Sequence, residues 1–339
     1  MPISLEQIGL EPISEIKQEL LLELSGGERF VTHAHNPCMV QILEKTFGWK
    51  GAAFLLLQDQ KPVGFFSCMF IHGRVVSMPH FSYGGLLTTD PGRQELFMHL
   101  LPQIHKYFHS GSKDQLPYLV RDSSSIGNRV VNTKVISWID IAGCNPDVVI
   151  PATQMAKVRK ALKAGLTSKS GGTELLDDFY SVYSRNMLRL GSPVLPIKLF
   201  RNILEGYRDG TARVVCVYKD KKPVGAGFLL SFAGFFENTW FSTLSNYNHL
   251  YPAQLLHYDM IRIAVHEGGH TYSFGRSTAG SGVHEFKRRW HSNETIVYWN
   301  YDKPVTSDLR KARFLSHLWK FLPLRIANAL GPLVSGRVY

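Results

Sequence analysis

A seven-residue phrase occurs twice in this chain. It is QDQKPVG at positions 58–64 and KDKKPVG at positions 219–225, and five of the seven residues are identical. Each copy lies between two apolar runs, a pattern that predicts a β-hairpin with a polar turn. The two copies are about half a chain apart in 339 residues, which predicts one domain built twice. The alternative is the chance recurrence of a common surface hairpin.

The composition is that of an ordinary globular protein, with 44% hydrophobic and 19% charged residues. No apolar run reaches the roughly 18 residues of a membrane-spanning helix, and the N-terminus lacks the apolar core of a signal peptide. The four cysteines are scattered without a CxxC pair, which favours reduced thiols. We therefore expect a cytoplasmic protein, held at the inner face of the membrane if its basic tail meets lipid.

The net charge of +11 favours anionic partners: RNA, nucleotide-linked substrates or an anionic membrane surface. Cations cluster at 157–169, at 287–289 and in the tail from Asp308 to Tyr339, which has six Lys or Arg and one acidic residue. A solvated helix face is the alternative for each cluster. Residues 308–322 predict a basic amphipathic helix, which would either contact the membrane or pack on its own domain. Its apolar residues are Leu309, Ala312, Leu315, Leu318, Trp319 and Leu322.

Apolar periodicity and capping signals predict the same order of elements in each half: hairpin, strand, long helix, strand. Helices are expected at 36–47, 91–109, 152–164, 173–190, 196–207 and 252–267. Strands are expected at 52–58, 62–71, 74–79, 116–121, 134–141, 211–218, 222–232, 235–242, 270–274 and 294–300. This order resembles the core of the GNAT (Gcn5-related acyltransferase) fold, present twice. We predict an α/β (α+β) class with tandem GNAT-like domains at 1–150 and 151–305, each a mixed sheet flanked by helices, and a basic amphipathic tail at 306–339.

The segment His266-Glu267-Gly268-Gly269-His270 spells the H-E-x-x-H pattern of zinc hydrolases. That chemistry needs both histidines one turn apart on a continuous helix. Two glycines oppose a helix at this place, so we interpret the segment as a helix end and expect no metal site.

The most unusual local sequence is a Gly/Ser loop at 275–282 followed by a basic helical turn. Exposed loop N–H groups attract phosphate or an oxyanion. Arg276 would grip a phosphate or carboxylate in a bidentate fashion, the backbone around Ser277 would add N–H donors, and Lys287 would place a point charge on a carbonyl oxygen. The alternative is a flexible loop with a surface basic patch.

His257 lies on the helix that precedes this loop and is our candidate for a general base. An unperturbed imidazole has a pKa near ~6.5, which suits proton transfer at neutral pH. The alternative is a core histidine on the apolar side of its helix.

Several motifs in order resemble FemAB-type acyltransferases, in particular the FemAB-related proteins of exosortase/PEP-CTERM and exopolysaccharide gene clusters. The longest is LLHYDMIRIAVHEGGHTYSFGRSTAGSGVHEFKRRW, which ends at Trp290. The others are His35-Asn36-Pro37, Phe47-Gly48, Ser82-Tyr83-Gly84-Gly85, KVRKALKAG at 157–165 and FYSVYSRNMLRLGSPV at 179–194. The resemblance covers roughly residues 30–300 and implies two GNAT-like domains.

The resemblance also implies a reaction. Its best-known members move an amino acid from aminoacyl-tRNA onto an amine of a peptidoglycan precursor at the membrane. Arg276 and Lys287 match the positions that bind phosphates and the reacting centre, and Tyr83 and His257 are weaker matches. We expect transfer of an acyl or aminoacyl group to an amine or hydroxyl of an anionic saccharide or lipid-linked envelope precursor.

The acyl donor would act as a co-substrate without any cofactor, and it would be aminoacyl-tRNA, acyl-CoA or acyl-carrier protein. The sequence lacks the long helical hairpin expected of a tRNA-binding arm and the Q/R-x-x-G-x-G/A loop that ordinary GNAT enzymes use for pyrophosphate. A non-catalytic module that binds polysaccharide or precursor on a degenerate GNAT scaffold is therefore the alternative function.

Overall fold

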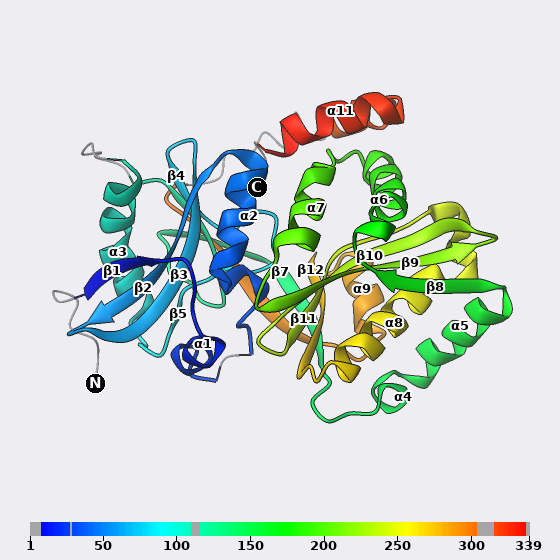
Figure 1. Ribbon diagram of the computed structural model, residues 1–339, viewed down its shortest axis with the longest axis horizontal. Coiled ribbons are helices and arrows are strands. Elements are labelled where there is room, and N and C mark those ends of the chain that lie inside the picture. The colour runs from blue at the N-terminus through cyan, green and yellow to red at the C-terminus, as the bar shows by residue number, and fades with distance from the viewer. Residues whose placement is uncertain (1–7, 28, 110–115, 304–314, 337–339) are drawn as a thin grey trace.

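The computed structural model describes residues 8–27, 29–109, 116–303 and 315–336 (Figure 1). The first half contains β1 (Ile8–Ile13), α1 (Gln18–Leu24), α2 (Pro37–Phe47), β2 (Lys50–Gln58), β3 (Lys61–Ile71), β4 (Arg74–Ser77), β5 (Leu87–Thr88), α3 (Arg93–Phe108), β6 (Tyr118–Asp122) and β7 (Arg129–Asp140). The rest contains α4 (Pro146–Val149), α5 (Ala152–Lys163), β8 (Leu166–Gly171), α6 (Leu176–Leu190), α7 (Ile197–Gly206), β9 (Gly210–Lys219), β10 (Lys222–Phe232), β11 (Phe235–Thr243), α8 (Pro252–His266), β12 (Thr271–Thr278), α9 (Gly282–Arg288), β13 (Asn293–Tyr301) and α11 (Leu324–Ser335).

The two copies of the repeated phrase form the same hairpin. In the β2–β3 turn, Asp59 and Gln60 have φ of 49° and 66°, and in the β9–β10 turn Asp220 and Lys221 have 49° and 65°. Two consecutive positive φ values are those of a type I′ turn. A register shift follows each turn, at Pro62–Gly64 in one copy and at the equivalent Pro-Val-Gly in the other. The shared phrase therefore fixes the turn and the irregularity beside it.

The described strands form one mixed sheet in the order β1-β2-β3-β4-β6-β13-β7-β12-β11-β10-β9-β8, with β5 beside β3. The two halves of this order have the same pattern about its centre. Parallel pairing, for example, occurs once in each half, between β4 and β6 and between β11 and β12. The halves also exchange their last strands. β7 pairs with β12 of the second half, and β13 lies between β6 and β7.

Helices cover both faces of the sheet. One apolar cluster packs α3 on β2, β3 and β6, and another packs α5 and α8 on β9 to β12. A third cluster unites α1, α2, α6 and α7 on the opposite face and contains residues from both halves. The predicted α/β class with tandem GNAT-like halves is confirmed. The limits of the predicted domains, at 150 and 305, stay a prediction.

Nearly all expected helices and strands are present, with ends that differ by a few residues. The largest difference is β7, which begins at Arg129 rather than 134. β1, α1, β5, α4, β8 and α11 were not predicted from the sequence. Of the predicted helix at 308–322, residues 308–314 lie outside the described part of the chain; residues 315–319 are helical, and α11 begins only at Leu324.

The H-E-x-x-H segment is a helix end, as predicted. α8 stops at His266, and Gly268 follows with φ of 73°. The N–H of Gly269 then bonds to the carbonyl of Ala264 at 2.8 Å, and His270 binds the carbonyl of Ala233 through Nε2. The two histidines of the pattern are therefore not on one helix: His266 ends α8, and His270 lies just before β12.

Candidate functional site

A cavity of about 750 Å³ opens where β11 and β12 separate. The two parallel strands pair only from Phe235 to Glu237 and from Thr271 to Ser273. Beyond these residues they diverge, and the gap between them is walled by the ends of α6 and α8 and by α9. The cavity is lined by 26 residues, among them His80, Asn186, Arg189, Asn238, Thr239, Tyr251, His257, Arg276, Phe286 and Lys287.

A β-bulge shapes the strand wall of this cavity. Phe228 of β10 pairs with Trp240, but Leu229 pairs with Asn238, so Thr239 is the extra residue. Asn238 is 2% exposed and lines the cavity. Neither atom of its side-chain amide has a hydrogen-bond partner among the described residues. A buried amide without partners is costly, which marks this wall as a place where a ligand is expected to bind.

Lys287 extends from the short helix α9 into the cavity and is 5% exposed. Its Nζ donates to the carbonyl of Gly275 at 2.7 Å, so two of its three N–H donors are not used by that bond. Burial lowers the pKa of Lys287 to about 8, an effect that nearby Glu237 opposes and Arg276 reinforces. This ammonium group therefore titrates close to neutral pH.

Arg276 lines the same cavity from β12 and is held against an aromatic ring. Its guanidinium carbon lies 4.9 Å from the ring centre of Trp299, and Arg121 of β6 lies 4.9 Å from the same ring. Neither arginine forms an ion pair with any carboxylate in the described ranges. Burial lowers the pKa of Arg121 to about 9, and Arg276 adds repulsion. The inner end of the cavity is thus cationic.

Glu237 is the buried carboxylate beside these cations. It is 1% exposed, and it accepts a hydrogen bond from Ser273 Oγ at 3.1 Å. Ser273 Oγ in turn accepts a hydrogen bond from the N–H of Gly275 at 3.0 Å. The carbonyl of the same Gly275 accepts the hydrogen bond from Lys287. Burial raises the pKa of Glu237, while hydrogen bonds and the two cations oppose that rise. Its other oxygen lies 3.8 Å from His33 Nε2.

His257 is enclosed by aromatic rings at the base of the cavity. It stacks on Phe241 with 4.4 Å between ring centres, and its Nδ1 lies 2.9 Å from the hydroxyl of Tyr272. Burial, followed by the charge of Lys287, lowers the pKa of His257 to about 3. The imidazole is therefore neutral at physiological pH and a weak base.

Two of the predicted site residues do not line the cavity. Ser277 is buried, and its Oγ has no hydrogen-bond partner within the described chain. Tyr83 packs among aromatic rings in the first half and donates to Ser123 Oγ at 3.3 Å. The structure thus brings His257, Arg276 and Lys287 together and leaves Tyr83 elsewhere.

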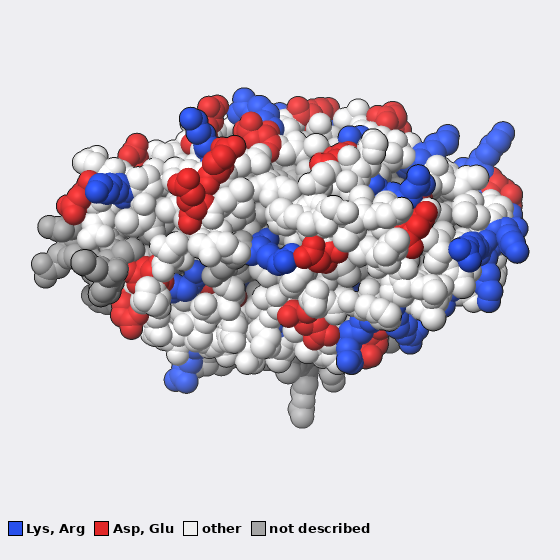
Figure 2. Space-filling view, turned by 90° about the horizontal axis from the view of Figure 1, so that it is seen from below, with Lys and Arg blue, Asp and Glu red and all other residues white. Residues whose placement is uncertain are grey.

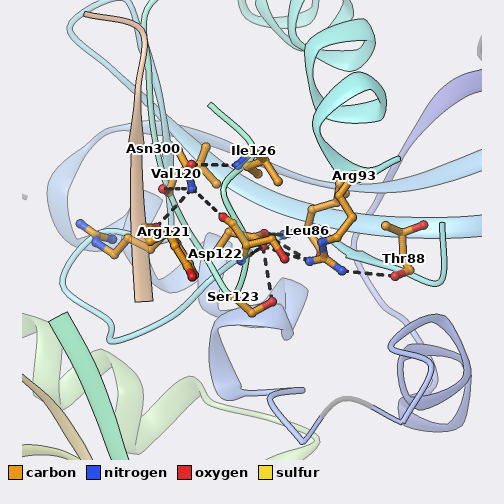
Figure 3. Close-up of polar contacts among 12 residues, drawn as sticks. Leu86, Thr88, Arg93, Val120, Arg121, Asp122, Ser123, Ile126 and Asn300 are labelled. Atoms are coloured by element: carbon orange, nitrogen blue, oxygen red, sulfur yellow. Dashed lines mark hydrogen bonds and ion pairs between the residues drawn. The ribbon is translucent and has the colours of Figure 1, made fainter. Parts of the chain in front are cut away.

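Through Ser123, Tyr83 instead borders a buried polar network in the first half (Figure 3). Asp122 lies at its centre, paired with Arg93 at 3.1 Å and accepting the N–H groups of Leu86 and Ser124. The same network anchors β13, because Asn300 Oδ1 accepts two backbone N–H groups of the loop after β6. These contacts are satisfied within the protein, so we interpret the network as structural.

Four residues at or near the site, Arg121, Glu237, Asn238 and Trp299, were not predicted from the sequence. Glu237 and Asn238 carried a usable signal, since they interrupt the apolar strand FFENTWF, and buried strands rarely contain a carboxylate without a partner. Arg121 and Trp299 are far apart in sequence, and only the placement of β13 beside β6 brings them together.

Charge on the surface is uneven. On the face shown in Figure 2, Lys and Arg gather at the right-hand end, which belongs to the second half, whereas acidic residues are spread over both halves. The cationic cavity therefore lies in the more basic half of the molecule.

Comparison with known proteins agrees with this architecture. Residues 153–288 match the family model described as an acetyltransferase (GNAT) domain. A search of the curated protein sequences finds no match to the chain. Three solved structures share the fold over nearly the whole chain. FemX superposes with a TM-score of 0.61 at 13% identity, covering 90% of this chain and 100% of FemX.

The second structure is a tandem GNAT protein from the clavulanic acid biosynthesis pathway, with a TM-score of 0.54, 12% identity and coverage of 88% and 99%. The third is L-PGS from Bacillus licheniformis. It superposes with a TM-score of 0.53 at 11% identity, covering 91% of this chain and 98% of L-PGS. Identities this low establish the fold alone. Residues 153–288 thus match a GNAT acetyltransferase domain, and the chain as a whole has the tandem GNAT fold that it shares with FemX.

Proposed function

We propose that this protein is an acyltransferase that moves an acyl or aminoacyl group onto an amine or hydroxyl of a cell-envelope or exopolysaccharide precursor. One observation carries the proposal: the strands β11 and β12 diverge around a cavity whose buried inner end holds Lys287 and Arg276. The match of residues 153–288 to a GNAT acetyltransferase domain supports acyl transfer as the type of reaction.

In the proposed reaction, the acceptor nitrogen or oxygen attacks the carbonyl carbon of the donor. The carbonyl oxygen gains negative charge, the bond to the donor's leaving group then breaks, and the acceptor loses one proton. Lys287 and the Asn238 amide stabilise the developing oxyanion, because buried donors act most strongly where water is excluded. Arg276 holds a phosphate or carboxylate of one substrate. His257 stays our hypothesis for the proton acceptor, although its low pKa makes it a weak base.

The donor is an activated acyl compound: aminoacyl-tRNA, acyl-CoA or acyl-carrier protein. The cationic cavity fits the phosphates that all three carry. The acceptor that we propose is an anionic saccharide or a lipid-linked precursor, and the proposed location is the cytoplasm at the inner face of the membrane. No described helix is long and apolar enough to cross a bilayer.

The test is a donor screen with purified full-length protein. Each radiolabelled donor class is incubated with cell-envelope precursors, and label transferred to the acceptor is counted. We expect transfer from one class, with the Arg276→Ala and Lys287→Ala variants about 10²–10³-fold slower. Arg288→Ala is the matched control, because Arg288 adjoins Lys287 on α9 but is 58% exposed and paired with Glu285. Absence of measurable binding of every acyl donor would favour the alternative, a non-catalytic module that binds polysaccharide or precursor.

A further inference from the structure

The C-terminal helix α11 has two apolar faces of different kinds. Its small residues Ala327, Gly331 and Ser335 are buried. A side chain at Gly331 would collide with Val194 of the loop after α6, since its Cβ would lie 2.5 Å from a Val194 methyl group. α11 therefore docks on the second half through its small-residue face, and Figure 1 shows it along the outer edge beside α6.

The neighbouring face of α11, about 100° around the helix, carries large aliphatic residues that the described structure leaves substantially exposed. Ile326, Leu330 and Leu333 follow helical spacing and are 46%, 41% and 69% exposed. Leu318 and Phe321 in the preceding segment are also exposed, and Phe321 reaches 73%. Single exposed apolar residues are normal, but several large ones within residues 315–336 indicate an interaction surface.

The charge of the tail that carries this patch has one sign. No Asp or Glu follows Asp308, whereas the same stretch carries six Lys or Arg. Lys320 and Arg325 are exposed beside the apolar residues. Large apolar side chains flanked by cations are typical of segments that lie in the interface of an anionic bilayer.

The patch also adjoins the entrance of the cavity. The α6 end residue Gly191 lies against Ser316 and Lys320 of the segment before α11. The residues just before it, Arg189 and Leu190, line the cavity. The tail and the cavity entrance therefore share the end of α6.

We propose that residues 315–336 form a membrane-docking surface that binds the anionic lipid bilayer through Leu318, Phe321, Ile326, Leu330 and Leu333. The expected membrane contact thereby shifts from the predicted 308–322 segment onto α11. A second copy of this chain is a poorer occupant, because its equal positive charge would repel. Docking places the cavity entrance beside the lipid headgroups. That suits a lipid-linked acceptor, a consequence that rests on the proposed function, whereas the docking itself does not.

The test is vesicle co-sedimentation of the full chain. We expect binding to vesicles of phosphatidylcholine mixed with phosphatidylglycerol, little binding to phosphatidylcholine alone, and release by high salt. The affinity of the double variant Leu330→Ser/Leu333→Ser for these vesicles should be lower by at least about tenfold. The matched control is Val148→Ser/Leu162→Ser, which removes two exposed aliphatic residues from α4 and α5 and should bind as wild type does.

Two results would overturn the docking proposal. One is wild-type protein that stays in solution with anionic vesicles. The other is a double variant that binds them as wild type does while its thermal unfolding is unchanged. Sedimentation velocity could give a third. If wild-type protein forms a dimer and does not bind vesicles, and the double variant is a monomer, the patch binds a second copy of the chain. Transfer to a water-soluble acceptor should be the same in the double variant, so failure of docking is distinguishable from failure of the proposed reaction.

Discussion

Lys287 connects the chemistry of the cavity to pH. Its pKa of about 8 follows mainly from burial, so the ammonium form predominates at neutral pH and is lost as pH rises. If this charge stabilises the oxyanion, kcat/KM should decline on the alkaline side with an apparent pKa near 8. Lys287→Met should lower kcat/KM by about 10²-fold or more and remove that decline. A decline that persists unchanged in Lys287→Met would assign the titration to another group.

Glu237 provides a second test with a defined sign. Its charge raises the pKa of Lys287, so removing that charge should lower it. Glu237→Gln keeps an oxygen to accept the bond from Ser273 Oγ, and it should shift the alkaline decline in kcat/KM to lower pH. A pH profile superimposable on that of wild type would mean that Glu237 is protonated near neutral pH or is too distant to act.

At the scale of single residues, the sequence indicated those that sit in unusual local surroundings. Arg276 and Lys287 flank a Gly/Ser loop whose composition signals anion binding, and both line the cavity. Arg121 could not be found in this way. It lies in a short apolar strand, and its place at the site depends on contact with the ring of Trp299, which is far away in the sequence. Likewise, the burial that gives His257 its low pKa depends on the rings of Phe241 in β11, Phe274 in β12 and Phe286 in α9.

At the scale of elements, β13 holds the two halves together through Asn300. This residue is fully buried; its Oδ1 accepts the N–H groups of Ile126 and Gly127, and its Nδ2 donates to the carbonyls of Val120 and Ser124 (Figure 3). Asn300→Ala leaves these backbone groups without their partner. Since each unsatisfied buried group costs about 1–3 kcal/mol, we expect the free energy of unfolding to fall by about 3 kcal/mol.

Urea unfolding followed by circular dichroism measures this loss. Asn128→Ala is a suitable comparison, because it changes the same residue type in the same loop where the side chain has no hydrogen bond among those described. Equal stability of Asn300→Ala and wild type would show that water replaces the lost bonds and that β13 is held by its strand pairing alone.

Local periodicity identified most elements because each helix and strand has its own apolar pattern. The position of β13 was beyond such reasoning. Its residues predict a strand, but nothing in them selects β6 and β7 as neighbours over a position beside β12. α11 was not predicted, although its exposed Ile326, Leu330 and Leu333 follow helical spacing. Its docked face consists of Ala, Gly and Ser, and such small residues do not indicate where a helix packs.

At the scale of the whole molecule, the duplicated phrase was the most informative feature. It predicted two similar halves, and the turns of both hairpins have the same backbone conformation. The sequence could not show that the halves exchange strands and share one apolar cluster. Because both exchanged strands lie between the halves, we expect the molecule to unfold as one unit despite its two repeats.

The shared interior also makes stability depend on pH. His33, His35, His80 and His257 come from both halves and are packed inside, where burial lowers the pKa of His35 to about 4 and of the other three to about 3. In the unfolded chain they titrate near ~6.5. Between these values the unfolded state binds more protons than the folded state, so the free energy of unfolding increases with pH. The contribution of these histidines to stability should be present above pH 6.5 and should be lost as pH falls toward 4.

His257→Phe isolates one contribution to this acid sensitivity, because phenylalanine preserves the aromatic packing and cannot take up a proton. Each such histidine adds a slope of about 1.4 kcal/mol per pH unit. Urea unfolding at a series of pH values from about 4 to 7 should therefore give a slope that is smaller by this amount in the variant. The slope is the quantity to compare, since the lost bond to Tyr272 lowers stability equally at every pH. An unchanged slope would show that His257 takes up its proton within the folded protein at ordinary pH, which would restore it as an effective general base.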